Sequence, residues 1–202
     1  YKLTPDNSID ISYSATTDKK TVINMTNHSY FNLSGDASTL STDNKLFVNS
    51  DSITPIDSTS MTSGEMMAVK NTPFDFSTER AISEKIGDTT CEQIKNGNGY
   101  DHNWVLKDKG NINVLAAKLT SPKSGITLQV YTNEPGIQVY TGNFLDGTVK
   151  GKKGIVYQQR AAVCLETQHY PDSPNKPQWP SVILEPGKTY TSHCIYKFSV
   201  EK

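Results

Sequence analysis

The stretch Asn24-Met-Thr-Asn-His-Ser-Tyr-Phe-Asn-Leu-Ser-Gly35 is the most informative part of this chain of 202 residues. It follows the segment Thr21-Val22-Ile23, which is typical of a strand, and it holds one histidine, three asparagines and two aromatic rings. Buried amide and imidazole groups cost free energy unless they are paired, so this mixture indicates either a built turn or a functional site. Asparagine and serine also favour turns. Both interpretations stay open at this point.

Composition excludes several classes of partner. The formal net charge of −1 and the pI near 6.5 give no electrostatic footprint for nucleic acid or for an anionic membrane surface. No apolar run approaches the roughly 20 residues needed to span a bilayer, and no signal-peptide pattern is present. Cys91, Cys164 and Cys194 have neither disulfide-framework nor metal-ligand spacing, so we expect no metal site. Free thiols lean towards a reducing compartment, although the compartment stays open.

Alternating apolar positions predict an all-β fold. Residues 1–4 are typical of the end of a strand, Ile9, Ile11 and Tyr13 share one face of the next strand, and residues 21–25 predict a third. A polar turn at residues 18–20 predicts that the second and third strands form an antiparallel hairpin. The chain is therefore expected to begin inside a sheet.

Further along the chain the pattern predicts more strands and little helix. Residues 45–49 predict a short strand, and residues 78–87 a brief helical turn that Thr78 caps and Gly87 ends. Residues 126–141 alternate on both sides of Asn-Glu-Pro-Gly and predict the clearest hairpin. The last strand places Tyr190, Cys194 and Tyr196 on one face.

Polar side chains at strand ends are the candidate functional groups. Asp101 follows two glycines, which permit close backbone approach, so it could face a ligand; an Asx cap in a glycine-rich turn is the local alternative. Gln138 and Tyr140 lie opposite the aliphatic face of their strand and would face a cleft or solvent. Glu166 ends an otherwise buried strand, as a general base or as half of an ion pair. The proline-rich and aromatic loop at residues 170–180 is typical of a sugar-binding wall.

Four motifs together resemble the aldose 1-epimerase, or galactose mutarotase, family. They lie at residues 26–33, 99–103, 135–144 and 165–172, in the family's order and over essentially the whole chain. The resemblance implies a large antiparallel β-sandwich of the galactose mutarotase-like supersandwich type, with residues 1–202 as one domain. It also implies interconversion of the α and β anomers of free aldohexoses such as glucose and galactose, without a cofactor.

The resemblance also assigns roles to residues. Glu166 stands where the family places the base that removes the C1 hydroxyl proton, and His28 where it places the acid that protonates the ring oxygen. Asp101 and Gln138 match positions that hydrogen-bond sugar hydroxyls. Chemistry agrees, because hemiacetal ring opening needs a proton removed at one oxygen and supplied at another, with typically about 10²–10⁴-fold gained per group.

One departure stands out. The family's upstream Asn-Arg and His-Gly-Gly segments do not occur here, and the arginines are Arg80 and Arg160. The chain therefore resembles the C-terminal part of a mutarotase that lacks its N-terminal strands. We expect weak activity from it alone, and association with the missing N-terminal segment or with a second copy through unpaired strand edges.

Two alternative functions are compatible with the same motifs. A hexose-6-phosphate epimerase would need cations for the phosphate, and the scarcity of arginine disfavours it. A non-catalytic carbohydrate-binding sandwich would keep the same cleft for affinity. The presence of both Glu166 and His28 favours the enzyme, because binding alone needs no matched acid and base.

Overall fold

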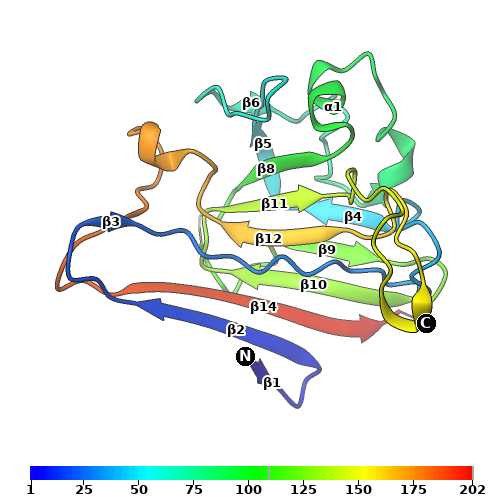
Figure 1. Cartoon of the computed structure of the whole chain (residues 1–202), viewed down its shortest axis with the longest axis horizontal. Helices are drawn as coiled ribbons and strands as arrows, with labels where there is room; N and C mark the ends of the chain where they lie inside the picture. The colour runs from blue at the N-terminus through cyan, green and yellow to red at the C-terminus, as the bar shows by residue number, and fades with distance from the viewer. Residues whose placement is uncertain (109, 202) are drawn as a thin grey trace.

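A computed structural model of the chain describes residues 1–108 and 110–201, and within them all paired strands are antiparallel. Two sheets pack face to face, and a two-stranded ribbon lies beside them (Figure 1). The larger sheet has the order β1 (Lys2–Leu3), β2 (Ser8–Ala15), β14 (Tyr190–Val200), β10 (Ile126–Thr132), β9 (Ala117–Thr120), β4 (Lys45–Val48) and β7 (Arg80–Ala81). The smaller sheet has the order β12 (Cys164–Gln168), β11 (Gly136–Tyr140), β8 (Asp101–Leu106), β5 (Ser50–Thr54) and β6 (Met67–Ala68). The ribbon pairs β13 (Ile183–Leu184) with β3 (Thr21–Val22).

One hydrophobic core fills the space between the two sheets. Ile137 and Val139 of β11 are fully buried, and they belong to the same cluster as Leu128 and Val130 of β10 in the other sheet. The Tyr196 hydroxyl donates to the Leu165 carbonyl at 2.6 Å, which joins β14 to β12 across the core. Because alternate residues of a strand face opposite ways, Gln138 and its partner Glu166 lie on the outer face of the smaller sheet. The predicted all-β antiparallel sandwich is confirmed, as is the long final strand.

The predicted hairpin over residues 126–141 is wrong. β10 pairs with β14 and β9, whereas β11 pairs with β12 and β8, so the intervening turn crosses from one sheet to the other. Glu134 in this turn is only 2% exposed and contacts His169, whereas its neighbour Asn133 is exposed. Both strands bury alternate aliphatic residues in the same core, and alternation does not reveal which strand is the partner.

The predicted opening hairpin is also wrong. β2 pairs with β1 and β14, whereas β3 pairs with β13. The third strand ends at Val22 rather than at Met25, because the Asn24 side chain and the Met25 amide bond to other elements in place of a strand ladder. The short strand predicted at residues 45–49 is present as β4.

Helix is scarce and short. Where residues 78–87 predict a helical turn, the structure has β7 followed by a 3-10 turn at Ile82–Glu84. The α-helix α1 (Glu92–Gly97) was not predicted, and Asn98 in the left-handed conformation ends it by donating to two carbonyls of its last turn. The other 3-10 turns are Lys152–Gly154 and Ser173–Asn175. Within the described residues no helix is long and apolar enough to cross a membrane. Cys91, Cys164 and Cys194 are free in the structure.

Candidate active site

The four residues singled out in the sequence lie around one cleft on the outer face of the smaller sheet. The cleft has a volume of about 370 Å³. Glu166 lies on β12, Gln138 on the neighbouring β11 and Asp101 at the start of β8, while His28 comes from the segment after β3. Their lining partners are Tyr30, Tyr140, Phe144, Gln168 and Pro171.

Strand register brings three of these side chains together. Gln138 is the cross-strand partner of Glu166, and Tyr140 is the partner of Asp101. Gln138 and Tyr140 are two residues apart on one strand, so these two pairs lie on the same face of the sheet. The Gln138 amide Nε2 donates to the Asp101 carboxylate Oδ1 at 2.8 Å. The Asx-cap interpretation of Asp101 is therefore wrong, because its carboxylate accepts from Gln138 in the cleft. Two residues before it, Gly99 has φ of +125°, and a Cβ there would lie 2.6 Å from the Asn143 side chain, so the turn itself requires glycine.

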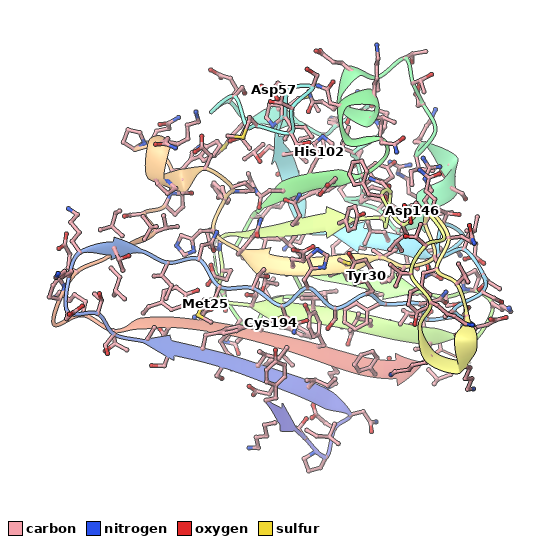
Figure 2. All side chains as sticks on the ribbon, in the orientation of Figure 1. Met25, Tyr30, Asp57, His102, Asp146 and Cys194 are labelled. Atoms are coloured by element: carbon pink, nitrogen blue, oxygen red, sulfur yellow. The ribbon has the colours of Figure 1, made fainter. Side chains whose placement is uncertain are left out.

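His28 is presented by residues 24–35, which we call the 24–35 segment. The segment runs beside the edge strand β12, where the backbone N–H and C=O of Phe31 bond to Val163 at 2.8 and 2.9 Å (Figure 1). The Asn32 side chain donates to the carbonyl of Ala161 and to two carbonyls of its own loop. Met25 and Tyr30 mark this segment in Figure 2. Both interpretations of the stretch thus hold in part: Asn32 builds the turn, and His28 faces the cleft.

The electrostatics of the cleft centre on Glu166. Its Oε1 lies 3.4 Å from Nε2 of His28, whose side chain is about half exposed, whereas Glu166 is buried at 7% exposure. Burial, with a smaller contribution from the Asp101 charge, raises the pKa of Glu166 to about 7. Burial also raises the pKa of Asp101, against the opposing effects of the Gln138 hydrogen bond and of His28. A carboxylate whose pKa lies near neutrality, beside an imidazole, is suited to moving protons at physiological pH.

Three aromatic rings line the cleft, and our sequence reasoning singled out only Tyr140 of these. Tyr30 stacks on His28 with ring centroids 4.9 Å apart, and Phe144 stacks on Tyr140 at 6.3 Å. Tyr30 is 50% exposed and Phe144 is 63% exposed. Exposed rings beside polar groups offer flat apolar faces to the C–H surface of a sugar. Exposure of this kind leaves no mark in strand periodicity, although Phe144 does lie within one of the four motifs.

The loop at residues 170–180 does not form the wall that the sequence suggested. Tyr170 and Trp179 are 3% and 5% exposed and pack against each other. Of this loop, Pro171 lines the cleft. The aromatic rings are used for packing, because they bury large apolar area that a surface wall would leave in water.

A buried histidine supports Asp101 from behind. The Asp101 backbone N–H donates to Nδ1 of His102 at 3.2 Å, so Nε2 carries the ring proton and faces Oε1 of Gln93 at 3.2 Å. His102 is labelled in Figure 2. It is fully buried, and burial lowers its pKa to about 3. It is therefore a neutral structural residue, with no access to a substrate.

One group of donor atoms near the cleft has the composition of a metal site. Nitrogen of His28, sulfur of Cys164 and a carboxylate oxygen of Glu166 lie within 4.8 Å of one another. Cys164 is fully buried, and burial raises the pKa of its thiol. A metal ion binds the deprotonated thiolate, so the raised pKa makes metal binding by this thiol costly. We therefore assign no metal to these residues.

Comparison with known proteins places these features in a family. The family model "Aldose 1-epimerase" matches residues 1–197. The chain is 41% identical to galactose mutarotase from Homo sapiens over 94% of its own length, and 39% identical to aldose 1-epimerase from Escherichia coli K12 over its whole length. It covers 54% of the human protein and 58% of the bacterial one, so it spans little more than half the length of these relatives.

Solved structures agree. The crystal structure of a GalM/aldose epimerase homologue from C. elegans matches the whole chain with a TM-score of 0.88 and 30% identity, and the chain covers 59% of it. Galactose 1-epimerase from Lactobacillus acidophilus matches 99% of the chain with a TM-score of 0.83 and 31% identity, and 55% of that protein is covered. The matched motifs, the sandwich and the family model together lead to one conclusion: this chain belongs to the aldose 1-epimerase family.

Proposed function

We propose that the protein interconverts the α and β anomers of free aldohexoses, with Glu166 as general base and His28 as general acid. The observation that carries the proposal is the buried Glu166 carboxyl, with a pKa of about 7, whose Oε1 lies 3.4 Å from Nε2 of His28. A pure binding site has no use for such a pair, because burying an ionisable carboxyl costs free energy that a neutral amide would avoid.

The proposed reaction moves two protons and breaks one bond. Ionised Glu166 takes the proton of the C1 hydroxyl, the C1–O5 bond breaks, and protonated His28 gives its proton to O5. The open-chain aldehyde then rotates about C1–C2. In the reverse sense, O5 attacks the other face of C1 while His28 recovers the O5 proton and Glu166 returns its proton to the C1 oxygen. Nothing is consumed, so the two residues end in their starting protonation states.

Asp101 and Gln138 are proposed to bind hydroxyl groups of the sugar. The bond from Gln138 to Asp101 leaves a carboxylate oxygen as acceptor and an amide hydrogen as donor towards the cleft. Gln168 lies beside them, with its Nε2 3.5 Å from Oε1 of Gln138. Such a row of fixed donors and acceptors is suited to a polyhydroxylated ligand.

The lining of the cleft favours free sugars over sugar phosphates. None of the described residues that line it is lysine or arginine, and two are carboxylic acids. The two arginines are used elsewhere: Arg80 lies over the Phe76 ring, and Arg160 donates to Asn98. A dianionic phosphate would therefore meet no bidentate partner here.

Polarimetry on the full-length natural protein tests the proposal. Mutarotation of α-glucose and of α-galactose should be accelerated well above the spontaneous rate, whereas glucose 6-phosphate should be a poor substrate. Faster turnover of the phosphate would indicate the phosphate-specific alternative. Sugar binding by calorimetry without any acceleration would indicate a non-catalytic binding module.

The pH dependence follows from the raised pKa of Glu166. This residue must be ionised to accept a proton, so kcat/KM, after subtraction of the spontaneous rate, should fall as pH drops below about 7. Protonation of this residue should lower kcat/KM about tenfold for each pH unit well below that value. Initial rates between about pH 5 and 8 measure the profile. A profile that stayed flat down to about pH 5 would remove Glu166 from the role of base.

We further propose that residues 1–202 are part of one mutarotase-like sandwich that works with additional polypeptide. The core cluster draws on both sheets, and nearly half of the human relative has no counterpart among these residues. At the edge strand β1, Leu3 is 80% exposed, which favours association.

Activity per mole should be lower for the 202 residues alone than for the full-length natural protein. Light scattering should show self-association of the shorter chain, and a fully active monomer would refute this.

A further inference from the structure

The 24–35 segment is tied to β12 and its flanks at two points, one on each side of His28. Downstream, Phe31 and Val163 exchange two backbone hydrogen bonds at 2.8 and 2.9 Å. Upstream, the Asn24 side chain makes the matching pair with the backbone of one residue: its Nδ2 donates to the His169 carbonyl at 3.0 Å, and its Oδ1 accepts from the His169 N–H at 3.0 Å. The Asn24 amide thus imitates a strand neighbour for His169.

These two ties determine the register of the segment. With Phe31 opposite Val163, antiparallel counting places His28 opposite Glu166. The same counting would place Met25, not Asn24, opposite His169, but the Met25 N–H donates to the Tyr190 hydroxyl at 3.2 Å instead. The Asn24 side chain therefore makes the two hydrogen bonds to His169 that the Met25 backbone would make in a regular strand pair.

The position of His28 relative to Glu166 depends on these ends, because the backbone between them is not bonded to β12. Between the two ties, the described residues show no backbone hydrogen bond from the segment to β12. The His28 side chain is about half exposed, and its stacking partner Tyr30 is itself 50% exposed. Met25 and Asn27 bond instead to the hydroxyls of Tyr190 and Tyr1, at 3.2 and 3.1 Å, and neither partner belongs to β12. The two ties are therefore what fixes the segment against β12, and loss of one should shift His28 relative to Glu166.

His169, whose backbone Asn24 binds, is itself held in place through its side chain. Nδ1 of His169 lies 2.5 Å from Oε2 of Glu134, and Glu134 is buried at 2% exposure in the turn between β10 and β11. A buried carboxylate needs such a partner, so the two residues hold each other. The upstream tie therefore connects the 24–35 segment to the turn that begins the strand of Gln138.

We propose that Asn24 is a positioning residue that sets His28 against Glu166, with His169 and Glu134 as its anchor. The inference rests on the proposed mutarotation, in which His28 and Glu166 must reach two oxygens on the same carbon. A displacement of about 1 Å between catalytic groups costs on the order of 10²-fold in rate.

The test uses the full-length natural protein and the variant Asn24→Ala. Loss of the upstream tie should lower kcat for mutarotation by about 10–100-fold while KM for the sugar changes little, because Asp101 and Gln138 are untouched. Asn96→Ala is the control: it removes an asparagine bond to a backbone carbonyl, that of Ile56 at 2.8 Å, which does not hold the 24–35 segment. Its kcat should stay within about twofold of the parent.

A double variant separates positioning from a general structural effect. If Asn24 acts through His28, then Asn24→Ala combined with His28→Asn should be no slower than His28→Asn alone. Independent losses that multiply would overturn the proposal, as would an unchanged kcat in Asn24→Ala. Should the alanine variant fail to fold, Asn24→Asp keeps the acceptor for the His169 N–H and loses the donor, and it should show a smaller loss of the same kind.

A structural measurement does not depend on the proposed function. Crystal structures of the parent and of Asn24→Ala should show the distance from His28 Nε2 to Glu166 Oε1 increasing from 3.4 Å by about 1 Å. If the parent does not catalyse mutarotation at all, the proposed function fails, and this distance alone decides the positioning role. An unchanged distance in the variant would overturn it.

Discussion

Replacing Glu166 by glutamine is expected to lower kcat for mutarotation by ~10³-fold or more in the full-length natural protein. The amide keeps the shape of the side chain and its place opposite Gln138, but it cannot accept the C1 hydroxyl proton. Substrate affinity should change little, since Asp101 and Gln138 still present their polar groups. Near-parental turnover from a folded Glu166→Gln protein would exclude Glu166 as the base.

The same variant should be more stable than the parent at alkaline pH. Burial raises the pKa of Glu166 from 4.5 to about 7, so the folded state binds more protons than the unfolded state between these values. The favourable contribution of the protonated group is fully present below about pH 4.5 and is lost as pH rises through 7. Glutamine removes the cost of the ionised form, so we expect a gain of about 1–3 kcal/mol at pH 8 that disappears near pH 4.5.

Urea unfolding of parent and variant at the two pH values measures this difference. Gln138→Ala is a suitable control, because it alters the same cleft without removing an ionisable group. It should raise KM, through a lost hydrogen bond of roughly 1–3 kcal/mol, and relative to the parent it should lack the gain in stability at alkaline pH that Glu166→Gln shows. Equal stability of parent and Glu166→Gln at alkaline pH would mean that burial of Glu166 carries no cost.

Local pattern predicted which way side chains point, but not which strands pair. Alternation correctly placed Ile137 and Val139 in the core and Gln138 on the opposite face, because strand geometry decides this within a few residues. The same alternation was misleading over residues 126–141, since β10 and β11 lie in different sheets. Whether two successive strands pair or cross the core depends on packing between distant residues, which a local period does not record.

In the candidate site, too, local sequence predicted individual residues but not the contacts between distant ones. His28 and Glu166 lie 138 positions apart in the chain and face each other through a register that Phe31 and Asn24 hold. Short motifs identified these two residues by resemblance, whereas nothing local indicated that Asn24 would bind the peptide of His169. Phe144 and Gln168 also line the cleft, and the sequence did not predict this. Residue type alone does not show whether an aromatic ring is exposed or in which direction a side-chain amide points.

Replacing His28 by asparagine is expected to lower kcat for mutarotation by about 10²–10³-fold, with a smaller change in KM. Asparagine retains a hydrogen-bond donor near the cleft, but it has no proton to give to O5 as the C1–O5 bond breaks. Folding should be nearly unaffected, because the side chain is about half exposed. A second variant makes the role specific: His28→Ala leaves space beside Tyr30, and added imidazole should restore part of the lost rate if the ring transfers a proton. If His28→Asn raised KM alone, and imidazole had no effect on His28→Ala, then His28 would bind the sugar, and another group would have to act as the acid.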